Sequence, residues 1–154
     1  MNSLSFTIQG KPVSTNDYKA SRVVRGKKLY SQMYETKKAK DYKGWIRESL
    51  LPHRADMFRF ETNFSIYEHA LACCAVIWLP DLLTKKDTIN RRSIDIDNSL
   101  KCLIDGVFNN FDKLDDKMIC DLFVQKRKAE KFSVDFTLHK VCLNDIIKSP
   151  SLGI

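Results

Sequence analysis

The sequence predicts a single α/β (α+β) domain, with a small mixed sheet and helices packed on one side of it. Three observations predict this class. The 154 residues suit one domain with a buried core. Apolar runs with strand patterning occur in both halves of the chain, and two segments between them have helical spacing of apolar residues. The resulting order of strand, helix, strand, helix, strand, strand is typical of a mixed α/β domain.

The first half of the chain is predicted to hold one strand, a basic loop and one helix. In residues 4–8 apolar and polar residues alternate, which indicates a half-buried strand. Residues 13–31 are polar, basic and without a clear period, and are predicted to form a loop. In residues 35–51 apolar side chains recur at three- and four-residue steps before Pro52, which predicts a helix. The pattern of residues 53–67 does not distinguish a strand from a loop.

The second half is predicted to hold three strands and one helix. The apolar run at residues 70–79 indicates a strand that is buried on both faces and central to the sheet. Residues 81–93 form a charged linker. Residues 97–109 have the apolar stripe of a helix. Residues 118–126 and 131–139 are predicted to be two strands, paired as a hairpin.

The domain is predicted to cover residues 1–140, and residues 141–154 to form a C-terminal tail that is partly helical or loose. The ten-residue apolar run is too short to span a bilayer, and the N-terminus lacks the pattern of a signal peptide. Five cysteines, two of them adjacent, argue against a disulfide framework. The three histidines lack zinc spacing. We therefore expect a protein of the reducing cytosol.

The net charge of +7 is unevenly distributed. Residues 11–54 hold twelve Lys or Arg against four Asp or Glu, so the N-terminal third carries the whole excess. Such a charge favours a nucleic acid or another polyanion as partner, although it also serves solubility. Within the basic loop, aromatic residues are interleaved with cations that suit a DNA backbone, namely Arg22, Arg25, Lys27 and Lys28.

An acidic cluster stands in contrast to this basic background. Asp95, Asp97, Asp105 and Asp116 lie close in the sequence and include Lys101 among them. Clustered acids repel each other and repel DNA, a conflict that a bound divalent cation resolves. Magnesium prefers oxygen ligands, and metal-activated water hydrolyses phosphodiesters. The pattern therefore predicts a metal-dependent nuclease, with Lys101 as a fixed positive charge near the phosphate.

Each of these residues also has an ordinary structural interpretation. Asp95 or Asp97 alone suits the N-cap of the helix. Lys101 and Asp105 suit a surface pair one helical turn apart. Asp115 and Asp116 suit a turn.

These residues resemble the motif of the RusA family of Holliday junction resolvases, small endodeoxyribonucleases common in phage and prophage genomes. The motif is an Asp-x-Asp-Asn, a Lys three residues later, an Asp four further on, and a Leu-Asp-Asp after a short loop. Here it stands as Asp95-Ile96-Asp97-Asn98, Lys101, Asp105 and Leu114-Asp115-Asp116. The first predicted strand and the following residues 10–16 also resemble the start of the family.

The resemblance implies a RusA-like fold and a homodimer that binds four-way DNA junctions. It implies symmetric cleavage of two strands of like polarity with Mg²⁺, for which Mn²⁺ substitutes. The implied metal-binding and catalytic residues are Asp95, Asp97 and Asp116, with Lys101 also catalytic. Supporting roles fall to Asn98, Asp105 and Asp115. The candidate DNA contacts are Asn16, Arg22, Arg25, Lys27, Lys28, Arg91 and Arg92.

The chain departs from the family pattern at Ile94, because the family often has Arg directly before the first Asp. Arg91 and Arg92 lie upstream instead. Two other functions remain open: a non-catalytic module that binds junction DNA, and a nuclease with the same site that cuts flaps or other branched DNA. The dimer interface is also open, since the apolar faces of the 97–109 helix and the 70–79 strand suit either an interface or the core.

Overall fold

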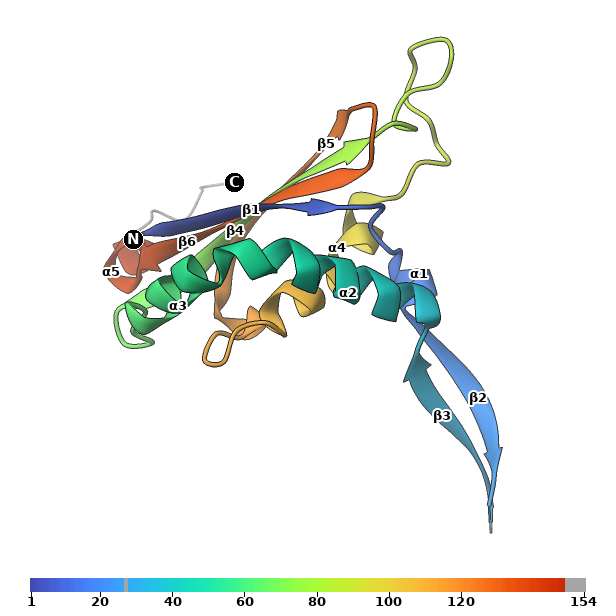
Figure 1. The fold of residues 1–154 in the computed structure, drawn as a ribbon, viewed down its shortest axis with the longest axis horizontal. Coiled ribbons are helices and arrows are strands. Elements are labelled where there is room, and N and C mark those ends of the chain that lie inside the picture. The colour runs from blue at the N-terminus through green and yellow to red at the C-terminus, as the bar shows by residue number, and fades with distance from the viewer. Residues whose placement is uncertain (27, 149–154) are drawn as a thin grey trace.

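The computed structural model describes residues 1–26 and 28–148 (Figure 1). The strands along these residues are β1 (Ser3–Gln9), β2 (Lys19–Arg25), β3 (Leu29–Glu35), β4 (His69–Leu79), β5 (Ile119–Lys128) and β6 (Ser133–Cys142). The helices are α1 (Thr15–Tyr18), α2 (Lys37–Leu50), α3 (Arg54–Thr62), α4 (Ile96–Phe108) and α5 (Leu143–Lys148). Single 3₁₀ turns lie at η1 (Leu51–His53) and η2 (Asp116–Met118).

The main sheet has the strand order β1-β6-β4-β5 and is mixed. Strand β6 is antiparallel to both of its neighbours, whereas β4 and β5 run parallel and are connected through α4. Helices α2, α3 and α4 lie together on one side of this sheet (Figure 1). The predicted fold class is therefore confirmed.

The predicted hairpin between residues 118–126 and 131–139 is wrong. Both segments are strands, β5 and β6, but each pairs with β4 from opposite sides. The connection between them crosses the end of β4, where the backbone N–H of Ala129 donates to the carbonyl of Leu79. A short connection favours a hairpin, but the apolar β4 displaces that pairing because it takes the central place between them.

Strand β4 is central, as predicted, but only one of its faces is fully buried. Its buried side chains alternate with half-buried ones along residues 73–79. The buried face packs in the core with the inward residues of β1 and β6, and the rings of Phe6 and Phe136 stack at 5.4 Å. The apolar faces of α4 and β4, each a candidate for core or interface, both belong to the core.

Helix α4 lies close against α2 at Gly106. A Cβ atom at this glycine would lie 2.5 Å from Cδ1 of Ile46 and 3.3 Å from Cγ of Lys43. The missing side chain therefore lets the two helix axes approach. This contact fixes where both ends of α4 emerge from the core.

Residues 13–31 are not a loop, contrary to prediction. They contain α1, all of β2 and the start of β3, and β2 pairs with β3 as a separate antiparallel hairpin, here called the ribbon. The ribbon projects away from the sheet and its helices (Figure 1). Side chains on both of its faces are exposed, among them Val23, Tyr30 and Met33. A strand pair exposed on both faces has no alternation of apolar and polar residues to reveal it.

The unsettled segment 53–67 contains a helix, α3, which is neither of the alternatives considered. Its buried residues are Met57, Phe60 and Glu61, at helical spacing. The apolar residues Phe58 and Ile66 obscured that spacing because both are exposed.

The end of the chain is partly described. Strand β6 extends to Cys142, beyond the predicted domain limit at residue 140, and α5 follows it. The predicted division at that residue stays a prediction, and residues 149–154 of the tail lie outside the described residues. All five cysteines are free thiols in the structure. Among the described helices, none is long and apolar enough to cross a membrane.

The buried stack of Phe6 on Phe136 gives a test of the fold. Phe136 is 0% exposed, so we expect Phe136→Ala to leave a cavity and lower the free energy of unfolding by about 3–5 kcal/mol. The control is Phe58→Ala, because Phe58 is 68% exposed and should change stability by about 0.5 kcal/mol or less. Urea denaturation of both variants measures the difference. Equal losses would contradict the assignment of the core.

Candidate active site

The first turn of α4 carries two exposed carboxylates, Asp95 and Asp97. Asp95 occupies the N-cap position, but its side chain caps no backbone N–H. Its carboxylate instead accepts one hydrogen bond from the side-chain amide of Asn98, at 3.3 Å. The capping interpretation of Asp95 therefore does not hold, and most of its acceptor capacity faces solvent.

A groove of about 610 Å³ runs beside this turn. Its lining includes Asn16, Arg91 and Arg92, three of the predicted DNA contacts, together with Asp95 and Asn98. The hydroxyl of Thr15 donates to the backbone carbonyl of Asn98 at 3.1 Å, which ties α1 to the first turn of α4. The fold thus gathers cations from the loop before α4, an amide from α1 and an acid from the N-cap of α4.

A further cation reaches the start of α4 from the edge strand β5. Nζ of Lys126 donates to the carbonyl oxygen of Ile94 at 2.8 Å. Ile94 holds the position where the related family often has Arg. Lys126 therefore places a positive charge next to the backbone of that position although the residue itself is apolar.

At the opposite end of α4 a small pocket of about 160 Å³ is lined by Asp105, Asn109, Asp115 and Asp116, with apolar side chains around them. Asp115 acts as a cap, since its carboxylate accepts the backbone N–H of Lys117 at 2.9 Å. That bond, and then the hydrogen bond with Asp116, lower the pKa of Asp115. The same hydrogen bond with Asp115, followed by burial, raises the pKa of Asp116. Asp115 is thus used to bind a backbone N–H, and Asp116 is the acid whose charged form a nearby cation would stabilise.

The loop that carries these two acids is held by Glu61 on α3. Its buried carboxylate accepts the backbone N–H groups of Lys113 and Leu114, the latter at 3.1 Å. Two backbone donors are thereby satisfied away from water. Glu61 consequently fixes the position of the following Asp115 and Asp116.

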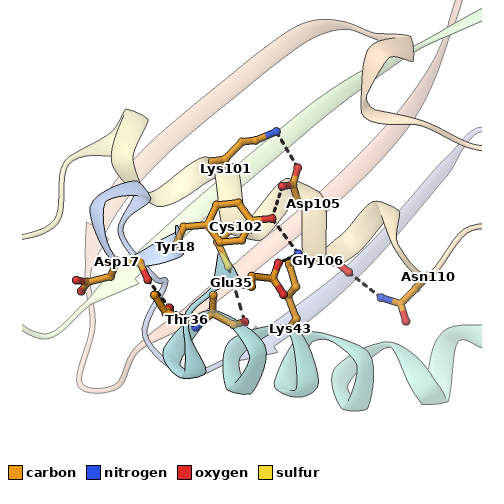
Figure 2. A network of polar contacts seen from close by, with 11 residues as sticks. Asp17, Tyr18, Glu35, Thr36, Lys43, Lys101, Cys102, Asp105, Gly106 and Asn110 are labelled. Carbon is orange, nitrogen blue, oxygen red and sulfur yellow. Dashed lines mark hydrogen bonds and ion pairs between the residues drawn. The ribbon is translucent and has the colours of Figure 1, made fainter. Parts of the chain in front are cut away.

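Lys101 belongs to a chain of polar contacts that enters the protein (Figure 2). Its ammonium binds Asp105 at 3.0 Å, and Asp105 accepts the hydroxyl of Tyr18 at 2.6 Å. Lys43 donates to the Tyr18 oxygen at 2.9 Å and forms an ion pair with Glu35. Burial, and then the Asp105 carboxylate, raise the pKa of Tyr18, so its hydroxyl stays protonated. The bond from Lys43 lowers the pKa of Glu35.

Among the described residues, the predicted metal ligands Asp95, Asp97 and Asp116 do not gather into one cluster. Asp97 stands in the first turn of α4, whereas Asp116 stands beside Asp105 in its last turns. At 1.5 Å per residue, the helix separates Asp97 from Asp105 by about 12 Å. Within the residues that the structure describes, no three His, Cys, Asp or Glu side chains gather as a metal site. The donors are the hard oxygens that Mg²⁺ prefers.

The remaining predicted DNA contacts lie on the ribbon, where Arg22 and Arg25 belong to β2 and Lys28 directly precedes β3. Arg22 donates to the side-chain carbonyl of Gln32 on the opposite strand, at 3.0 Å. Lys27 lies outside the described residues.

Several residues of the site escaped prediction from the sequence. Tyr18, Lys43 and Glu35 form the inner part of the polar chain, Glu61 holds the acidic loop, and Lys126 reaches Ile94. Only the helical spacing of Glu61 with Met57 could have indicated a buried acid. The other contacts join segments far apart in the sequence and leave no local pattern.

Removal of the Glu61 carboxylate tests how the acidic loop is held. We expect Glu61→Ala to lower the free energy of unfolding by about 2 kcal/mol, because two backbone donors lose a charged acceptor. Glu61→Gln keeps one acceptor oxygen and should lose less. The exposed Glu48 of α2 provides the control, since Glu48→Ala should be nearly neutral. Chemical denaturation distinguishes them, and similar values for Glu61→Ala and Glu48→Ala would refute this role.

The arrangement can be compared with known proteins. No curated protein sequence matches the chain. The sequence model described as Endodeoxyribonuclease RusA matches residues 9–138, which include the ribbon, all four core strands in whole or part, and both ends of α4. The match covers most of the 154 residues, and the chain therefore belongs to the RusA family of endodeoxyribonucleases.

Proposed function

We propose that this endodeoxyribonuclease is a homodimer that resolves four-way DNA junctions by paired, symmetric, metal-dependent hydrolysis of phosphodiester bonds. The observation that carries the proposal is that the acids differ in whether they bind a backbone N–H. Asp115 is used as a cap, whereas the carboxylates of Asp95, Asp97 and Asp116 accept no backbone N–H from the residues that the structure describes. In a protein of net charge +7, carboxylates that leave most of their oxygen atoms open to solvent suit a cation that also binds a DNA phosphate.

The proposed ligands of the cation are Asp95, Asp97 and Asp116. When bound, a divalent cation such as Mg²⁺ or Mn²⁺ supplies an activated water and neutralises charge on the phosphate. The protein's own contribution is positioning. Lys101 offers a fixed positive charge, held by Asp105, to the developing negative charge of the phosphate oxygens. Asn98 orients the carboxylate of Asp95.

The homodimer is part of this proposal because of the distance along α4. A second copy can bring the first-turn acids of one protomer to the Asp116 loop of its partner. A two-fold dimer also suits a substrate with two equivalent strands to cut. Both sites of such a dimer would depend on the interface, which couples the two cuts.

DNA contacts are proposed for two surfaces. The groove beside Asp95 offers Arg91, Arg92 and Asn16, and Lys126 adds a cation at its edge. The ribbon adds Arg22, Arg25 and Lys28 beside exposed aromatic side chains that can stack on unpaired bases. Phosphate contacts of this kind make binding strongly dependent on salt. Free thiols at all five cysteines suit work in a reducing cytosol.

Cleavage of a labelled, immobile four-way junction tests the enzyme directly. We expect paired symmetric nicks in Mg²⁺, none in EDTA, and a rate about 1000-fold lower for Asp97→Asn, since metal stabilisation is worth several kcal/mol. Asp56→Asn is the control, because Asp56 lies on α3 and pairs only with Arg59 at the surface. Its rate should equal that of the unchanged protein.

The same assay decides between the alternatives. Tight binding of the junction without cleavage in Mg²⁺ or Mn²⁺ would overturn the proposed nuclease activity and favour a non-catalytic binding module. Faster cleavage of a flap than of the junction would keep the site and change the substrate. Cleavage that persists in EDTA would overturn the proposed metal dependence.

Mixed variants test whether two protomers share each site. Asp97→Asn and Asp116→Asn should each be inactive alone. Mixed and allowed to exchange subunits, they should regain cleavage, because each mixed dimer holds one site with all its acids intact. Sedimentation of the mixture verifies that dimers form. Dimers that remain inactive after exchange would place all three acids of a site on one chain.

A further inference from the structure

Asp105 is bound at both of its carboxylate oxygens. Oδ1 accepts the ammonium of Lys101 at 3.0 Å, and Oδ2 accepts the hydroxyl of Tyr18 at 2.6 Å (Figure 2). A carboxylate held from two directions cannot rotate without breaking one of these bonds. The position of the Lys101 ammonium therefore depends on the bond at the far side of Asp105.

The direction of the Tyr18 hydroxyl is fixed as well. Its oxygen already accepts a hydrogen bond from the ammonium of Lys43, at 2.9 Å, and that ammonium has no acceptor capacity. The proton of this hydroxyl reaches Asp105 at 2.6 Å, and the Glu35 carboxylate is a second acceptor near the same hydroxyl. Lys43 is in turn held by its ion pair with Glu35.

Burial distinguishes this chain of contacts from a surface pair. The side chain of Lys101 is 53% exposed, but that of Asp105 is 19% exposed and Tyr18 as a whole only 5%. Charged hydrogen bonds are stronger away from water, so the inner end is the rigid one. Lys101 thus extends from a fixed interior into solvent, where a DNA phosphate can reach it.

Tyr18 is also the point where the ribbon joins the core. It ends α1 and directly precedes β2, and its carbonyl accepts the backbone N–H of Thr36, the N-cap of α2. Glu35, the last residue of β3, belongs to the same chain of contacts. One tyrosine therefore connects the ribbon, α2 and α4.

We propose that Tyr18 is a positioning residue for Lys101, acting through Asp105. The proposal rests on the function proposed above, in which Lys101 meets the reacting phosphate. Without the hydroxyl, Asp105 can turn, and Lys101 regains the rotamer freedom that a preorganised site must remove. The chemical step should slow while DNA binding stays unchanged.

The test is the single-turnover rate of junction cleavage at saturating protein, measured beside the dissociation constant of the junction without metal. For Tyr18→Phe we expect a rate about tenfold lower and a dissociation constant within about twofold. The matched control is Tyr42→Phe, because the Tyr42 hydroxyl is buried on α2 and has no hydrogen-bond partner among the described residues. Its rate should not change.

A double-mutant cycle shows whether Tyr18 acts through Asp105. Asp105→Asn should slow the chemical step, and Tyr18→Phe added to it should cause no further loss. The proposal would be overturned if the fold loss in rate of the double variant equalled the product of the two single losses. It would also be overturned by a Tyr18→Phe rate equal to that of the unchanged protein. A loss carried entirely by weaker junction binding would also overturn it, since it would place Tyr18 in DNA contact.

Failure of this proposal is distinguishable from failure of the proposed function. Lys101→Ala with an unchanged cleavage rate would refute the role of Lys101 itself. An inactive Lys101→Ala beside a fully active Tyr18→Phe would refute only the role of Tyr18. If circular dichroism shows that Tyr18→Phe does not fold, Asp105→Asn alone decides, with a slowed chemical step and unchanged binding expected and an unchanged rate contradicting the proposal.

Discussion

The close packing of α4 on α2 is the contact on which the rest of the site depends. Gly106 removes the side chain that would separate the helices at Ile46, and the core of the domain closes over the resulting contact. Because α4 is rigid, its position also sets where its two ends emerge. Asp95 at the start of the helix lines the groove, Asp97 follows it in the first turn, and the last turns lie beside the loop of Asp116. The same contact brings Lys43 of α2 within reach of Tyr18.

The charges of the site divide into satisfied and unsatisfied groups. Inside, positive and negative charges alternate from Lys101 through Asp105 and Lys43 to Glu35, with the neutral Tyr18 between them. Outside, the described residues include no ion-pair partner of Asp95, Asp97 or Asp116, and the hydrogen bond with Asp115, followed by burial, raises the pKa of Asp116. This distribution of charge is the basis of the proposed cation site.

The elements of the core were predictable because each carries a local pattern. Alternation in β1, the apolar run of β4 and the helical stripes of α2 and α4 all follow from burial of one face. The ribbon and α3 were not predictable in this way, since Val23, Tyr30 and Phe58 are apolar but exposed. The pairing of β5 with β4 depends on long-range competition between strands, which no local window contains. In the site, the motif indicated Asp95, Asp97, Lys101 and Asp116, whereas the separation of the acids along α4 appears only in three dimensions.

The ribbon joins the domain at a narrow base and shares no strand with the main sheet. Its ladder is independent of the register of β1, β6, β4 and β5, so a change in its length or composition disturbs no pairing in the core. It is therefore a module that evolution or an engineer can exchange, with Tyr18 and Glu35 kept as its attachment points. On the proposed function, a change in the ribbon alone would alter which DNA shapes such a nuclease accepts and leave the acids around α4 unchanged.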